Sequence, residues 1–295
     1  MACMMNIRLP GMVSLVLCAI FLTGAAAGET AAQPSQTAAR PQLGVFSWQR
    51  ENISNEGSLR EMLDTLVQVG AGEVYQYMDT KAAPSFLRMA KELRIDVYAL
   101  AGRPEWGLDP NAKRMLNEIK KVAKLTAQLG DAGPAGLMLD IEPYLTDAYK
   151  KNPDRTMETY LAAMRKTYAY AQEAGVTLIL CIPYFYDSLG HTDVLNALIR
   201  ETSDAVAVMN YHKKNESGQI KTEMAAATQA GKRLIHIYEL QALGLFDLTE
   251  RNTYHLDGLP AVWASRDKLQ AAFKSDSLSF ALHDYTALRE VLTRK

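Results

Sequence analysis

Short apolar runs alternate with longer helical segments along most of the chain. Eight runs are rich in β-branched and aromatic residues and have the length of buried strands, and each is followed by apolar residues at helical spacing. The eight runs are 43–48, 72–79, 95–101, 135–142, 177–184, 204–212, 233–239 and 278–285. This pattern predicts eight strand–helix units in sequence order.

Glycines separate several of these units. Gly70, Gly130 and Gly175 each follow a helical segment, at the position where a glycine commonly caps a helix. The strand starts recur about every 30 residues, which is the spacing of an eight-unit barrel of about 250 residues. An open, doubly wound sheet shows the same alternation, but no glycine-rich phosphate loop follows any of the runs. The sequence therefore predicts an α/β protein with a single (β/α)8 (TIM) barrel, and the open sheet is the alternative.

The first 27 residues differ from the rest of the chain. Arg8 is their only charged side chain, an apolar run covers 11–22, and the small residues that follow offer a signal-peptidase cleavage site. We expect residues 1–27 to be a secretory signal peptide, 28–40 a flexible lead-in and 41–295 the barrel domain. An uncleaved membrane anchor is the alternative, although the run is shorter than the ~20 residues that span a bilayer. The expected location is periplasmic or secreted, with no membrane attachment after cleavage.

Composition narrows the class of partner. The chain has 295 residues, 48% of them apolar, and its 32 basic and 33 acidic residues nearly balance. This balance argues against nucleic acid and anionic lipid, because both need a basic surface. Beyond the expected signal, Cys181 is the one cysteine, and its apolar surroundings predict a buried thiol without an internal disulfide. The expected partner is a small or neutral molecule, and the sequence sets no oligomeric state.

The active site of such a barrel lies at the carboxyl ends of its strands, so the polar residues there are the candidates. Asp140 and Glu142 end an apolar strand and share the face of Met138, because side chains alternate along a strand. Two neighbouring carboxylates do not both ionise readily, so one pKa is expected to rise, as a general acid at neutral pH requires. An ion pair with a basic residue such as Arg103 is the structural alternative.

A third carboxylate, Glu239, ends the seventh strand on the same face as Ile235 and Ile237. The fourth and seventh strands lie on opposite sides of an eight-stranded ring, so Glu142 and Glu239 are expected to face each other across a substrate. Two carboxyl groups that flank a glycosidic bond suffice for its hydrolysis, one as the acid and the other as nucleophile or base. A glutamate that caps a loop or pairs with an arginine is the alternative for Glu239.

Aromatic and polar side chains are predicted to surround these carboxylates. Flat rings stack on the apolar faces of sugars, and polar groups bind their hydroxyls. The expected substrate-binding residues, all at or just after strand ends, are Trp48, Tyr77, Arg103, Tyr184, Asn210, His212, Asp284 and Tyr285. Their residue types favour a carbohydrate as the substrate.

Two strand ends resemble a known family. The segment 135–142 reads A-G-L-M-L-D-I-E and is similar to the strand-4 signature D-G-x-D-x-D-x-E of the family 18 chitinase-like barrels in its glycine, its last aspartate and its glutamate. The segment 209–211 reads M-N-Y and is similar to that family's strand-6 motif M-x-Y-D. The resemblance implies that Glu142 is the acid, that Asp140 orients an N-acetyl group of the substrate, and that Tyr211 holds it. Cleavage assisted by the substrate in this way needs no protein nucleophile.

The first hypothesis is thus an exported glycoside hydrolase that needs neither cofactor nor metal. Glu142 is its general acid/base, Asp140 modulates that residue, Glu239 is the nucleophile or second carboxylate, and Tyr211 positions the substrate.

Two further hypotheses remain. The second hypothesis is a non-catalytic glycan-binding barrel. It is open because the first and middle aspartates of the strand-4 signature are Ala135 and Met138 here. The third is a metal-dependent hydrolase such as a deacetylase, whose ligands would come from histidines and carboxylates at strand ends. The residues available for that site are Asp140, His212, His283 and Asp284.

Overall fold

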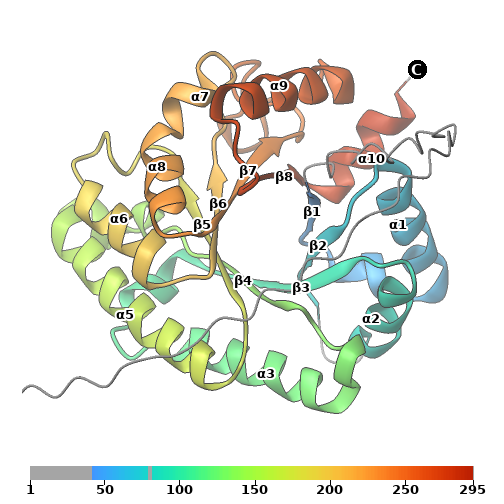
Figure 1. Ribbon diagram of the computed structural model, residues 1–295, viewed down its shortest axis with the longest axis horizontal. Helices are drawn as coiled ribbons and strands as arrows, with labels where there is room; N and C mark the ends of the chain where they lie inside the picture. The colour runs from blue at the N-terminus through green and yellow to red at the C-terminus, as the bar shows by residue number, and fades with distance from the viewer. Residues whose placement is uncertain (1–41, 79–81, 295) are drawn as a thin grey trace, which may run out of the picture. The chain divides into compact units, whose positions relative to one another are not determined.

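A computed structural model describes residues 42–78 and 82–294 of the chain. In this part, eight parallel strands follow one another around a closed barrel, and helices surround it (Figure 1). The predicted single (β/α)8 barrel is therefore confirmed. The expected signal peptide (1–27) and lead-in (28–40) lie outside the described residues, as does Asp79 at the end of the second predicted strand.

Each strand is followed by at least one helix. The strands are β1 (Leu43–Ser47), β2 (Glu73–Gln76), β3 (Asp96–Ala101), β4 (Gly136–Asp140), β5 (Leu178–Pro183), β6 (Ala205–Met209), β7 (Arg233–Glu239) and β8 (Leu278–His283). The α-helices are α1 (Glu56–Val69), α2 (Ala83–Glu92), α3 (Lys113–Leu129), α4 (Asp147–Lys151), α5 (Pro153–Glu173), α6 (Thr192–Glu201), α7 (Glu216–Gln219), α8 (Lys221–Gln229), α9 (Gly258–Phe273) and α10 (Tyr285–Thr293). Short 3-10 helices are η1 (Arg50–Ile53), η2 (Pro104–Leu108), η3 (Gly130–Ala132), η4 (Pro143–Leu145) and η5 (Leu245–Asp247).

Strand β1 closes the barrel. Its Gly44 lies opposite Glu73 of β2 on one side and opposite Ala281 of β8 on the other. An open sheet has two edge strands with one neighbour each, whereas each of these eight strands pairs with two others, which rules out the doubly wound alternative. The helix end predicted at Gly70 is also present, because Gly70 caps α1 with a φ of 72°, a conformation that glycine adopts without steric cost.

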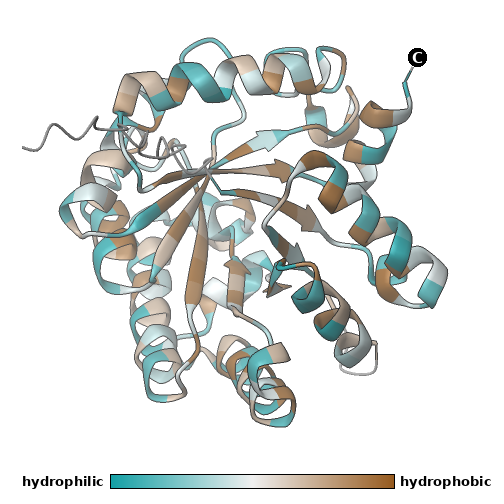
Figure 2. Cartoon of the chain, turned by 45° about the vertical axis from the view of Figure 1, so that its right-hand side comes forward, coloured by the Kyte–Doolittle hydropathy of each residue, from teal (hydrophilic) through white to brown (hydrophobic). Residues whose placement is uncertain are grey.

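The barrel strands are largely hydrophobic along their length, as Figure 2 shows. The outward side chains form one large core with the surrounding helices, whereas the inward ones form a second core inside the barrel. The second core consists of Phe46, Tyr75, Leu100, Met138, Ile179, Cys181, Ala205, Ala207, Met209, Ile235, Ile237 and Ala281. Cys181 is thus a buried free thiol, as predicted.

Six of the eight strands end earlier than their apolar runs predict, and three of them end at positions that matter for the site. The run 135–142 gives a strand that ends at Asp140, and the run 204–212 gives one that ends at Met209. The last run, 278–285, is a strand only to His283, because α10 begins at Tyr285. In each case the chain turns away from the barrel before the run is complete, so the simple alternation of inward and outward positions does not extend to its last residues.

The described part of the chain contains no helix that is both long and apolar enough to cross a membrane.

One buried carboxyl group gives the fold a pH dependence. Glu223 of α8 is fully buried, and neither of its carboxyl oxygens has a hydrogen-bond partner among the described residues. Burial raises its pKa from 4.5 to about 8. Between these two pH values the unfolded chain releases the proton that the folded chain keeps, so stability falls as the pH rises. Glu223→Gln is expected to remove this fall and to stabilise the protein by about 1–3 kcal/mol at pH 8.

Urea unfolding of both proteins at pH 5 and pH 8 measures this effect. The exposed Glu250 supplies the matched control, Glu250→Gln, which should keep the pH dependence of the wild type. Equal pH dependence in wild type and Glu223→Gln would contradict the prediction.

Candidate active site

The end of β4 brings two carboxyl groups to the mouth of the barrel. Asp140 is the last residue of this strand, and Glu142 directly precedes η4. Met138, two residues before Asp140, belongs to the core inside the barrel, so the alternation of the strand directs Asp140 inward as well. In the parallel register Asp140 lies opposite Cys181, which is also an inward residue.

A glycine on the neighbouring strand fixes the position of this pair. Gly102 follows β3, and a Cβ atom added to it would lie only 1.8 Å from the carbonyl oxygen of Asp140. No side chain fits at that distance, so only glycine allows the two backbones to approach so closely. The backbone that follows β3 therefore packs directly against the end of β4, next to the carboxyl pair.

Both carboxyl groups of the pair have raised pKa values, and the charge of Glu142 contributes to that of Asp140. Burial and the charge of Glu142 raise the pKa of Asp140 to about 7, against the opposing effect of His283. Burial also raises the pKa of Glu142, although the hydrogen bond from the Tyr144 hydroxyl and the nearby His283 act in the other direction. Asp140 Oδ1 is buried without a hydrogen-bond partner among the described residues. The pair is thus suited to carry one proton near neutral pH, as the sequence predicted.

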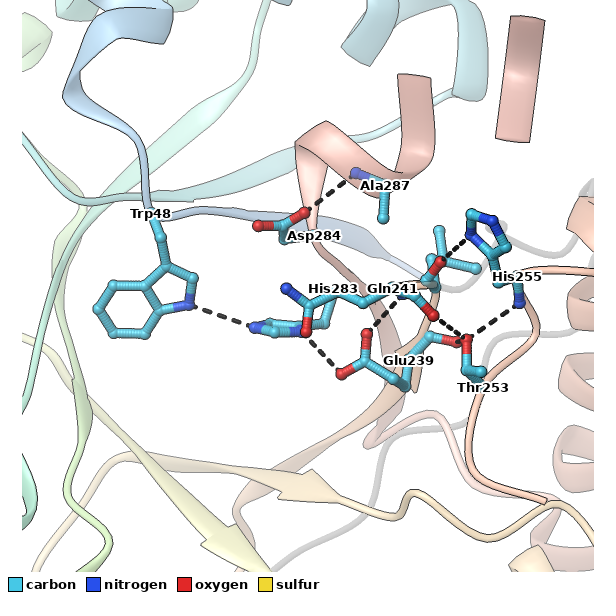
Figure 3. A network of polar contacts seen from close by, with 9 residues as sticks. Trp48, Glu239, Gln241, Thr253, His255, His283, Asp284 and Ala287 are labelled. Carbon is cyan, nitrogen blue, oxygen red and sulfur yellow. Dashed lines mark hydrogen bonds and ion pairs between the residues drawn. The ribbon is translucent and has the colours of Figure 1, made fainter. Parts of the chain in front are cut away.

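A hydrogen-bonded chain crosses the opposite side of the mouth, from β7 through β8 to β1 (Figure 3). Glu239 is 3% exposed, and both of its oxygens accept hydrogen bonds: Oε1 from the backbone N–H of Gln241 at 2.7 Å and Oε2 from His283 Nδ1 at 2.9 Å. His283 Nε2 lies 3.2 Å from Trp48 Nε1. Glu239 thus reaches the mouth, as predicted. Its contacts indicate that its role is to orient the ring of His283.

The partners of His283 also define its tautomer. The indole N–H of Trp48 can only donate, so Nε2 of His283 must accept and its proton resides on Nδ1, toward Glu239. Burial lowers the pKa of His283, but the hydrogen bond and charge of Glu239 outweigh burial and raise it overall. Protonation of Nε2 would place two N–H groups against each other, so the contact with Trp48 favours the neutral ring.

Glu239→Gln is expected to lower the pKa of His283. The substitution removes the negative charge that opposes burial, and a group buried without that charge holds a proton less readily. A titration followed by NMR of ¹⁵N-labelled histidine measures this pKa and the tautomer in both proteins. The exposed control Glu250→Gln should leave both unchanged. An unaltered His283 pKa in Glu239→Gln would show that the two residues do not interact.

Aromatic rings complete the mouth. The rings of Trp48 and Tyr77 lie 6.1 Å apart between centroids, and those of Tyr211 and His283 lie 6.2 Å apart. Arg50 of η1 places its guanidinium 4.5 Å from the centre of the Tyr77 ring and also donates a hydrogen bond to its hydroxyl. Trp48, Tyr77 and Tyr211 all pack against the core inside the barrel, which puts their side chains on the inward face.

Four predicted substrate-binding residues have their side chains engaged in other contacts, away from the mouth. Tyr184 packs on the outer core, with its ring against that of Phe185. Asn210 is buried and contacts His236 and the carbonyl of Glu216.

The other two of the four belong to the start of α10. Asp284 accepts a hydrogen bond from the N–H of Ala287 and so caps the helix, as Figure 3 also shows. Tyr285 is 2% exposed and lies in the outer core. Tyr184 and Tyr285 pack on the outer core, whereas Asn210 and Asp284 follow the ends of their strands, where the alternation of the strand no longer sets the direction of the side chain.

The remaining two predicted residues lie at the rim. Arg103 follows β3 and is exposed, and His212 follows β6 and is half-buried. Sequence reasoning did not select Tyr144 or Arg50 as site residues, and it named His283 only as a candidate metal ligand. A signal existed for His283 alone, because it ends β8 two residues beyond the inward Ala281.

The residues expected for a metal site do not gather into one. Within residues 42–78 and 82–294, no group of three His, Cys, Asp or Glu side chains is placed to hold a metal ion. His283 instead contacts Glu239 and Trp48, and Asp284 caps α10.

The fold and this mouth define a (β/α)8 barrel with paired carboxyl groups at its carboxyl-terminal face. No family model and no curated protein matches the chain. Solved structures do match it. A family 18 chitinase mutant from Cycas revoluta in complex with (GlcNAc)4 has a TM-score of 0.52 at 11% identity, covering 85% of this chain and 97% of that one.

Two other matches show how broad the likeness is. A candidate alpha-L-fucosidase from Bacteroides thetaiotaomicron has a TM-score of 0.52 at 12% identity, covering 89% of this chain and 91% of that one. A candidate deoxyribose-phosphate aldolase from Toxoplasma gondii has a TM-score of 0.51 at 11% identity, covering 85% and 93%. At such identities the likeness shows the fold alone, so the resemblance to glycosidase barrels is confirmed at that level.

Proposed function

We propose that this chain is a glycoside hydrolase in which Glu142 is the general acid/base. The observation that supports this most is the carboxyl pair of Asp140 and Glu142, buried at the mouth, with both pKa values raised. A carboxyl group that keeps its proton near neutral pH can protonate the oxygen of a glycosidic bond. The chitinase and the candidate fucosidase among the similar structures have the same fold.

The nucleophile in this proposal belongs to the substrate. Both oxygens of Glu239 already accept hydrogen bonds, which leaves it poorly placed for attack on a sugar. The resemblance to family 18 chitinase-like barrels instead points to a neighbouring N-acetyl group. Its carbonyl oxygen attacks the anomeric carbon while Glu142 gives its proton to the leaving oxygen and the glycosidic bond breaks. Glu142, now a carboxylate, then takes a proton from the water that opens the cyclic intermediate.

In this proposal, Asp140 and Tyr211 bind the N-acetyl group of the substrate. Asp140 Oδ1 lacks a partner among the described residues and is buried beside Glu142, so it is the acceptor for the N–H of that group. Its negative charge would also stabilise the positive charge that forms on the cyclic intermediate. Tyr211 faces the same mouth and contacts His283, and we assign it the acetyl oxygen.

Export belongs to the proposal as well. The proposed signal peptide, residues 1–27, would deliver the barrel to the periplasm or the medium, where polysaccharides are available to it. N-terminal sequencing of the protein recovered from the cell envelope or medium tests this: a first residue at or near 28 supports cleavage.

The test of the activity is reducing-end release from soluble oligosaccharides, N-acetylated and not. Cleavage of N-acetylated members by the wild type, absent from a parallel preparation of Glu142→Gln, would support the proposal. Binding without cleavage of any member would favour a glycan-binding barrel instead. Cleavage abolished by a chelator and restored by a divalent metal would favour a metal-dependent hydrolase.

A further inference from the structure

A cavity of about 330 Å³ adjoins the proposed active site on the side of β1, β2 and β3. Its lining includes Trp48 and Tyr77, which also face the mouth, and then Arg103, Trp106 and residues of α3. The volume is at the lower end of the range typical of small-molecule sites. The cavity is therefore continuous with the aromatic wall of the mouth and has room for one further part of a bound chain.

The basic groups of this cavity are not equivalent. Arg50 is committed to Tyr77, whose ring and hydroxyl it contacts. Lys121 of α3 forms an ion pair with Glu118 at 2.8 Å, and both residues line the cavity. The side chain of Arg103 is exposed, and no hydrogen bond or ion pair joins its guanidinium to another described residue. Its guanidinium is thus the positive group of this cavity that remains available to a ligand.

A short series of contacts connects Arg103 with the carboxyl pair of Asp140 and Glu142. Gly102, which packs against the backbone of Asp140, directly precedes Arg103 and also lines the cavity. A substrate that reaches both places would meet buried acidic groups at the mouth and a free arginine beyond it. A neutral sugar ring is suited to the acidic groups at the mouth. A sugar ring that carries a carboxylate is suited to Arg103, because guanidinium binds carboxylate through two parallel hydrogen bonds.

We propose that this cavity is a subsite for a sugar residue that carries a carboxylate, with Arg103 as the group that binds the anion. The ring of that residue stacks on the aromatic wall formed by Trp48, Tyr77 and Trp106. Arg50 holds Tyr77 in place for this contact. The inference rests on the proposed function and narrows its substrate to chains in which N-acetylated sugars neighbour uronic acids.

The experiment compares binding of two forms of one oligosaccharide. The first is a hexasaccharide of alternating N-acetylglucosamine and glucuronate, and the second is its methyl ester, which has the same rings without the charge. Calorimetry at low salt should show that wild type binds the acid about tenfold more tightly than the ester. Arg103→Gln should lose this preference, whereas Lys124→Gln, an exposed residue of α3, should keep it.

Equal binding of acid and ester by the wild type, binding of neither, or an unchanged preference in Arg103→Gln would overturn the proposal. Because binding is measured, its result is separate from that of the proposed function. A preference for the acid without cleavage would keep the subsite and reject the hydrolase. Cleavage of N-acetylated chains with no preference for the acid would do the reverse.

Discussion

Glu142→Gln is expected to lower kcat by about 10³-fold while the affinity for substrate changes less than about threefold. Glutamine keeps the size of the side chain and can still accept the hydrogen bond that Tyr144 donates to Glu142. It has no acidic proton, so it cannot protonate the leaving oxygen or later activate water. The measurement is kcat and KM on the best oligosaccharide of the panel, with direct binding of the same oligosaccharide to the variant.

The exposed Glu173 at the end of α5 supplies the matched control, because Glu173→Gln changes the same group far from the mouth. This control should retain wild-type kinetics. A Glu142→Gln protein with kcat close to that of the wild type would remove Glu142 from the chemical step. Rescue of a truncated variant, Glu142→Ala, by a small carboxylic acid such as formate would strengthen the assignment.

Asp140→Asn is expected to lower kcat by about 10²-fold and to change the pH profile. In the wild type, the charge of Glu142 raises the pKa of Asp140, so the pair keeps its last proton to a higher pH than a single carboxyl group would. In the variant, Glu142 has no second carboxyl group beside it, so it loses its proton at a lower pH than the wild-type pair does. The alkaline limb of kcat/KM should therefore move to lower pH, by about one unit.

A profile from pH 4 to pH 10 for wild type and variant measures this shift. The exposed Asp276 gives the control Asp276→Asn, whose profile should coincide with that of the wild type. A movement of the alkaline limb to higher pH, or no movement, would contradict the coupling between Asp140 and Glu142. A loss of kcat without a shift would instead indicate that Asp140 acts only on the substrate.

The barrel was predictable from the sequence because its signal is repeated eight times. Apolar runs of strand length recur between helical segments. Each run identifies one strand–helix unit, even where the predicted strand ends are wrong by a few residues. Inward positions within the strands were predictable for the same reason. Alternation from Ile235 and Ile237 to Glu239, and from Met138 to Asp140, follows from the geometry of a strand.

The residues after the strand ends were not predictable in this way. Asn210 and Asp284 lie where the chain has left the strand, so their partners depend on the following helix and on contacts distant in sequence. Glu239 contacts His283, and His283 contacts Trp48. These residues come from the ends of three different strands, which lie far apart in the sequence. Only the closed barrel brings these residues together, and no local sequence pattern predicts their contact.

The contact of Gly102 with Asp140 divides the site into two parts that can vary independently. The proposed catalytic carboxyl groups stand at the end of a barrel strand, locked by a neighbouring backbone, whereas Arg103 and Trp106 belong to the connection that leads into α3. Exchange of such connections between related barrels would alter which glycans are accepted without displacing the proton donor. For enzyme engineering, this makes the segment 103–112 a suitable region for libraries aimed at new substrate specificity, and position 102 one to leave untouched.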